Sequence, residues 1–237
     1  MITDRNPLKD LQNSLNRVKG NLHILETNVS VEKQMEYFRF SEEIKHDFSD
    51  EQVIEEQINI LKSKESSIRD IKYALAFLAV SGNVKAYRAI ETYNETHSDD
   101  WAVMSFLQAG ITLRSQFSDE RQIFISSGLG GKDGLIRFYA FFKSRNGGFF
   151  SDYQKELIEK EIPYIVQRYN GITEEIIVQN NYFHLLFLIQ LNVDIKKMIE
   201  EAIEECNQYG NFINKDFVIT NVKVFSEEEI QDELKRR

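Results

Sequence analysis

Apolar residues recur every three or four positions through the first half of the chain, the spacing typical of amphipathic helices. Ile54, Ile58 and Leu61 share one such stripe, and further stripes of the same kind follow it. Residues 30–116 are therefore predicted to form a series of helices. The weakly periodic residues 1–29 are expected to be a mobile arm or a loose helix.

The predicted helices repeat an arrangement of small and apolar residues. The pair Phe77-Leu78 is followed by Gly82, and the same arrangement returns 28 to 29 residues later. The segment "ALAFLAVSGNVKAYRAIETYNETHSDDWAVMSFLQAG" resembles HEAT-like repeats, in which stacked helical hairpins bury their apolar faces against one another. This resemblance, over about one and a half repeats, implies a helical-repeat region over residues 30–116.

After about residue 116 the apolar pattern changes from the helical period to alternation. In "LIRFYAFFK" the apolar residues of one strand face are Ile136, Phe138, Ala140 and Phe142. From Leu135 onward the predicted order is strand, helix, strand, strand, helix, strand, which resembles the ferredoxin-like fold. The segment "QIFIS" is predicted to add one strand, paired through a glycine loop.

The expected fold class is therefore α+β. An N-terminal α-helical, HEAT-like region is expected to precede a ferredoxin-like α/β sandwich with an extra edge strand, which would occupy residues 121–237. Many unrelated functions share the ferredoxin-like fold, so the resemblance implies no particular activity.

The composition is that of an acidic globular protein. The chain has 237 residues, 42% of them hydrophobic, and a net charge of -9. Neither half has the basic excess that favours binding to nucleic acid, so no nucleic-acid partner is expected. The single cysteine, Cys206, excludes an internal disulfide and any zinc site with two or more thiolates.

Membrane association and secretion are not expected either. The start of the chain has no apolar signal core, and the longest apolar run, "YFHLLFLI", is too short to cross a bilayer as a helix. A cytoplasmic protein without a membrane partner is predicted.

The most suggestive motif is the glycine-rich stretch "SSGLGGKDG", residues 126–134. It departs from a Walker A loop, because Ser126 and Asp133 stand where the first glycine and the magnesium-binding hydroxyl belong. Phosphate-binding loops of this kind also precede a helix, whereas the residues after this stretch alternate as a strand. A hairpin turn is favoured, and a nest of backbone amides that binds an anion is the alternative.

Few other residues suggest chemistry. His184 lies in an apolar strand segment, where a buried histidine with one hydrogen-bond partner is favoured over a catalytic base. The segment "RFYAFF" resembles the aromatic strands on which RNA-recognition sheets stack bases. The basic, glycine-interleaved companion motif of those sheets is missing, so the aromatic side chains are interpreted as core.

These observations favour a non-enzymatic protein-protein interaction or scaffold module, with a protein partner or self-association. The alternative is that the C-terminal domain binds a small anion or nucleotide, or is an enzyme, around residues 128–134. No catalytic residue, metal ligand or cofactor is predicted, and whether the protein is an enzyme stays open. The candidate ligand-binding residues are Gly128, Gly130, Gly131, Lys132, Arg137 and His184.

Overall fold

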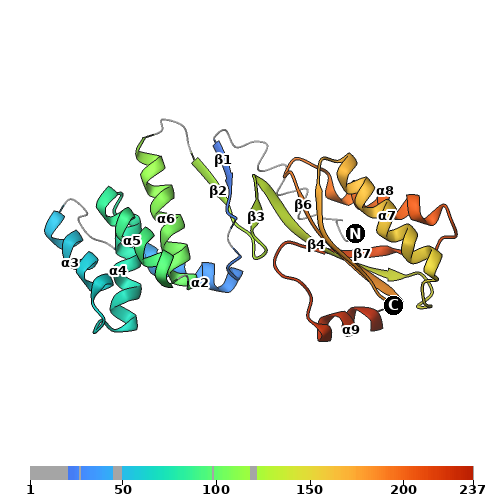
Figure 1. Ribbon diagram of the computed structural model, residues 1–237, viewed down its shortest axis with the longest axis horizontal. Helices are drawn as coiled ribbons and strands as arrows, with labels where there is room; N and C mark the ends of the chain where they lie inside the picture. Colours follow the sequence, from blue (N-terminus) through green and yellow to red (C-terminus); the bar gives the residue numbers. More distant parts are fainter. Residues whose placement is uncertain (1–20, 27, 45–49, 98, 118–121, 237) are drawn as a thin grey trace, which may run out of the picture. The chain divides into compact units, whose positions relative to one another are not determined.

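The computed structural model describes residues 21–26, 28–44, 50–97, 99–117 and 122–236. Its α+β architecture divides into two compact units, one over Gly20–Ile125 and one that includes Ser126–Arg237 (Figure 1). Within the described residues, no helix is long and apolar enough to span a membrane.

The first unit is built mainly from helices, as the apolar periodicity predicts. Polar side chains begin them: Ser30, Asp50, Ser67 and Asp99 each accept a hydrogen bond from a backbone amide of the first turn. The helices are α2 (Val31–Glu42), α3 (Glu51–Lys62), α4 (Ile68–Val80), α5 (Val84–His97) and α6 (Asp100–Gln116).

The core of this helical unit is aromatic as well as aliphatic. Tyr37 and Phe77 are fully buried, and the Tyr37 ring meets the Trp101 ring edge-on at 5.4 Å. The Trp101 indole N–H donates to the carbonyl of Lys72, which joins α6 to α4. Neighbouring helices therefore share one hydrophobic core.

Two short strands accompany the helices of this unit. β1 (Asn21–Ile24) pairs in parallel with β2 (Gln122–Ile125). Part of the predicted arm, residues 1–29, is thus a strand, while residues 1–20 and 27 lie outside the described residues. The prediction that "QIFIS" joins the C-terminal sheet is wrong, because its partner is a strand about a hundred residues earlier in the chain.

The second unit has the predicted ferredoxin-like sheet. Its strands lie in the order β7-β4-β6-β5, and every neighbouring pair is antiparallel. The extra edge strand is β3, which pairs with the first residues of β4. The strands are β3 (Gly131–Lys132), β4 (Leu135–Ser144), β5 (Ile172–Val178), β6 (Tyr182–Ile189) and β7 (Ile213–Thr220).

Two long helices, α7 (Asp152–Arg168) and α8 (Ile195–Asn207), pack together on one face of this sheet (Figure 1). Alternate residues of β4 fill that interface, and the Phe142 ring stacks on the Phe183 ring at 4.4 Å. Cys206 is fully buried on α8, and burial raises the pKa of its thiol to about 12. A short helix, α9 (Glu227–Lys235), lies on the other side of the sheet.

Candidate functional site

The sheet face that α7 and α8 leave uncovered is unusually aromatic. Side chains alternate along a strand, so the residues of β4 between the core positions point to this second face. We call this surface the aromatic face, and its residues are Tyr139, Phe141, Tyr182, His184, Leu186 and Val218. The Phe141 and Tyr182 rings lie 5.5 Å apart on neighbouring strands.

Helix α9 and the residue before its N-cap cover the aromatic face. The Phe225 ring lies 5.1 Å from that of Tyr139 and 5.9 Å from that of Phe141, and Ile230 and Leu234 pack beside them. Ser226 and Glu229 form the capping box that begins the helix. Beneath this cover Tyr139 and Phe141 are each only 1% exposed.

Two polar atoms of the aromatic face lack a hydrogen-bond partner. Among the described residues, none pairs with the buried hydroxyl of Tyr139 or with the buried Nδ1 of His184. The two rings are 5.5 Å apart. Burial lowers the pKa of His184 against the opposing effect of Glu175, so its neutral form is favoured.

The phenol of Tyr139 is perturbed in the opposite sense. Burial raises its pKa, and the nearby Tyr182 and Glu229 raise it further. The hydroxyl therefore stays protonated and remains a hydrogen-bond donor. Leaving such a buried group unpaired costs about 1–3 kcal/mol.

Two lysines connect the surroundings of the aromatic face to α9. The Lys143 ammonium, at the end of β4, donates to the carbonyls of Glu233 at 3.1 Å and of Arg236 at 2.9 Å. Lys223, in the segment before α9, forms an ion pair with Glu229 at 2.6 Å. Both cations thus lie where an anion that replaced α9 could meet them.

The glycine-rich stretch is a hairpin, as favoured from the sequence. β3 and β4 are joined by Asp133 and Gly134, whose φ angles of 51° and 76° suit a tight two-residue turn. Within the stretch, the amide of Leu129 donates to the Asn221 carbonyl and that of Gly130 donates to the Ser127 carbonyl. These two amides are used inside the protein and are not directed at a ligand.

Gly128 and Arg137 have structural partners. A Cβ at Gly128 would lie 1.9 Å from the carbonyl oxygen of Val222, so only glycine fits this approach. The Arg137 guanidinium forms an ion pair with Glu174 and donates to the Leu129 carbonyl at 2.7 Å. The hydrogen bond with Glu174 raises the pKa of Arg137 and lowers that of the carboxyl.

The structure brings only part of the predicted ligand-binding set together. The segment 128–132 and Arg137 are neighbours, because Arg137 bonds to the hairpin. His184 pairs across the sheet with Phe141, four residues along β4 from Arg137. At about 3.3 Å per residue this separates the two by roughly 13 Å. A ligand-binding role for these residues stays a prediction.

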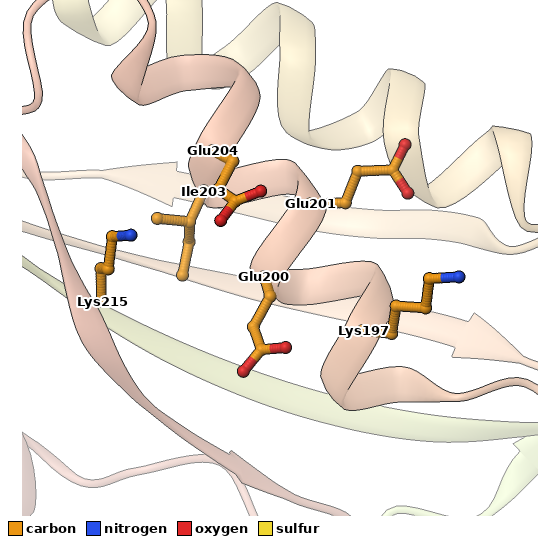
Figure 2. Close-up of a pocket in the computed structure, with 6 residues that line it drawn as sticks. All are labelled: Lys197, Glu200, Glu201, Ile203, Glu204 and Lys215. Atoms are coloured by element: carbon orange, nitrogen blue, oxygen red, sulfur yellow. The ribbon is translucent and has the colours of Figure 1, made fainter.

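A groove of about 470 Å³ lies on the second unit, and the sequence pattern did not predict it. Its lining residues are Lys197, Glu200, Glu201, Ile203, Glu204 and Lys215 (Figure 2). Glu201 is already engaged, because it accepts from Arg168 at 2.8 Å and from the Tyr169 hydroxyl at 2.7 Å. The charged groups point in different directions and do not converge on one position.

No family model matches the sequence, and no curated protein matches it. Parts of the chain match solved structures. One is described as a transposase from Deinococcus radiodurans R1; it has 13% identity and a TM-score of 0.36, over 43% of this chain and 89% of that one. Another is a REP-associated tyrosine transposase bound to a REP hairpin, with 11% identity and a TM-score of 0.33, over 49% of this chain and 68% of that one.

These matches contradict the leading functional expectation. Both proteins are described as transposases, whereas the sequence led us to expect a non-enzymatic protein-protein interaction or scaffold module. The expectation of no nucleic-acid partner is likewise wrong, since one of the matched proteins is bound to a REP hairpin. At this level of similarity the matches do not assign an activity to this chain.

The physical reason for the error lies in how charge and aromatic residues were interpreted. A net charge averages over surfaces that a ligand never touches, and many acidic side chains here lie on α7 and α8, across the sheet from the aromatic face. The aromatic residues of "RFYAFF" were all interpreted as one core. In the structure Tyr139 and Phe141 belong to a separate cluster on the second face.

Proposed function

We propose that the C-terminal unit binds single-stranded nucleic acid across the aromatic face, with bases stacked on Tyr139, Phe141 and Tyr182. Aromatic side chains on the central strands of a four-stranded antiparallel sheet are the platform on which RNA-recognition sheets stack bases. Stacking of this kind tolerates any base, because each one has a π-face.

The unpaired polar atoms of Tyr139 and His184 are the observation that carries this proposal. The residues that pack over Tyr139, namely Phe225, Ile230 and Leu234, have apolar side chains that offer no hydrogen bond. The edge of a base carries both donors and acceptors, so a stacked base could satisfy the phenol and the imidazole while it replaces the apolar cover.

The local charge supports a polyanionic ligand. Lys143 and Lys223 lie beside the aromatic face. Lys143 donates to carbonyls at the end of α9, and Lys223 forms an ion pair with Glu229 of α9. The acidic helices α7 and α8 lie on the opposite face of the sheet. The proposal concerns binding, and a cytoplasmic location remains a prediction.

Binding can be measured as the fluorescence anisotropy of a labelled 20-nucleotide oligothymidine at fixed ionic strength. The full chain should bind it saturably, and Tyr182→Ala should weaken binding, since one stacked base contributes about 1–3 kcal/mol. Tyr164→Ala is the matched control, because Tyr164 is 56% exposed on α7, across the sheet. Equal weakening by both changes would overturn the proposed site.

Because α9 covers the site, the same titration is repeated with Ile230→Asp, which places a charge under the cover. Absence of saturable binding in both the natural chain and this variant would overturn the proposed function. Pre-formed duplex of the same length serves as the competitor. It should displace the oligothymidine poorly, since its bases are already stacked and cannot reach the aromatic rings.

A further inference from the structure

We infer that α9 is a displaceable acidic cover, which competes with nucleic acid for the aromatic face and so keeps the site closed. This inference rests on the proposed function. It assigns to one short helix the regulation of access to that site.

The first support is where the charge of α9 lies. The helix carries five carboxylates, three of them in its first turn: Glu227, Glu228, Glu229, Asp232 and Glu233. Glu229 pairs with Lys223, and the negative charges of Glu227 and Glu229 help to raise the pKa of Tyr182 and Tyr139. Negative charge is therefore already present where the phosphates of a stacked strand would lie.

The second support is that α9 fits the surface incompletely. Its apolar contacts come from Phe225, Ile230 and Leu234, and they leave the Tyr139 hydroxyl and His184 Nδ1 unpaired. A ligand that both stacks on the rings and satisfies these atoms makes the better interface. Helix α9 therefore binds the aromatic face less tightly than a ligand that also satisfied these two atoms would.

The third support is that α9 can leave without disturbing the sheet. The approach of Gly128 to the Val222 carbonyl fixes the chain just after β7, and Val224 beyond it is 46% exposed. α9 has only nine residues, and a helix this short is marginal by itself in water. Release therefore means local unfolding of α9 beyond Val222.

The experiment compares three full-length proteins: the natural chain, Ile230→Asp and Gln231→Asp. Ile230 is buried against the aromatic face, whereas the neighbouring Gln231 is exposed, so the two variants add the same charge and only one disturbs the cover. Ile230→Asp should bind oligothymidine at least 10-fold more tightly. Gln231→Asp should bind like the natural chain.

Release of α9 is measured separately, as faster amide hydrogen exchange over residues 227–235 with unchanged exchange in β4 and β6. If that release occurs and affinity does not change, the inference is wrong and the proposed function stands. If the released variant and the natural chain both fail to bind, the proposed function itself is wrong.

A second variant covers the case in which Ile230→Asp unfolds the whole unit. Leu234→Asp disturbs a partly buried contact near the end of the same helix and should release it with less strain on the sheet. It should raise the affinity for oligothymidine in proportion to the increase in exchange over α9. A gain in exchange without a gain in affinity would overturn the inference here too.

Discussion

The two faces of the C-terminal sheet are built from alternate residues of the same strands, yet their covers differ. One face meets α7 and α8, with 17 and 13 residues, and its large side chains Phe138, Phe142 and Phe183 are fully buried. The other meets α9, with nine residues, and leaves two polar atoms unpaired. Low exposure alone therefore does not separate a permanent core from a closed binding surface. The extent of the helical cover separates the two faces instead.

The largest effect should come from breaking the permanent core. Phe183 is fully buried and stacks on Phe142. Phe183→Ala should cost about 3–5 kcal/mol of stability, because the removed ring leaves a cavity between sheet and helices. Native-state hydrogen exchange in β6 measures this loss.

The contrasting change is Ile230→Ala on the other face. Because α9 opens locally, Ile230→Ala should lower the stability measured by hydrogen exchange in β6 by less than about half as much as Phe183→Ala does. Exchange over residues 227–235 should nevertheless rise. Equal losses for the two variants would show that α9 belongs to the same cooperative core, and would break the distinction between the faces.

A smaller effect is expected at the hairpin that borders the aromatic face. Gly134 has a φ of 76° and Gly148 does not share that conformation, while a Cβ would find open space at both. Gly134→Ala should therefore cost on the order of 1 kcal/mol. Gly148→Ala should be neutral or slightly stabilising in thermal unfolding, and an equal cost at both positions would contradict a conformational origin.

The smallest effect should be the one that His184 has on how the free energy of unfolding changes with pH. Its pKa is lowered on folding, so the unfolded chain binds the proton more readily. The stability that neutral His184 contributes to the folded state is fully present above the unfolded pKa of about 6.5. It is lost as the pH falls below that value, because the unfolded chain then takes up the proton first. Urea unfolding at pH 7.5 and 5.5 should show a smaller drop for His184→Gln than for the natural chain. Identical drops would place the titration elsewhere.

Much of the fold follows from local pattern. The alternation in β4 predicted a strand with two different faces, and the glycine-rich stretch 126–134 before this strand predicted the hairpin. The order of helices and strands predicted the ferredoxin-like sheet. For the strand and the hairpin, the deciding interactions are within a residue's own element or the next one.

What could not be predicted depends on contacts far apart in sequence. β1 pairs with β2 across about a hundred residues, and no periodicity within "QIFIS" identifies that partner. The sequence marks Ser226 and Glu229 as a capping box, but not which surface the helix covers. Whether Tyr139 and His184 are satisfied depends on that placement, so the candidate site could not be found from the sequence alone.

The tether of α9 has a quantitative consequence. Residues 221–225 link α9 to β7. The helix therefore competes with any nucleic-acid strand at an effective concentration of about millimolar, whatever the amount of protein. A mononucleotide at micromolar levels would lose such a competition. A strand that spans several rings and lysines at once would not, because each further contact multiplies its affinity. The length of this short linker would thereby set a minimum ligand size, and the protein would respond to polymers while ignoring free nucleotides.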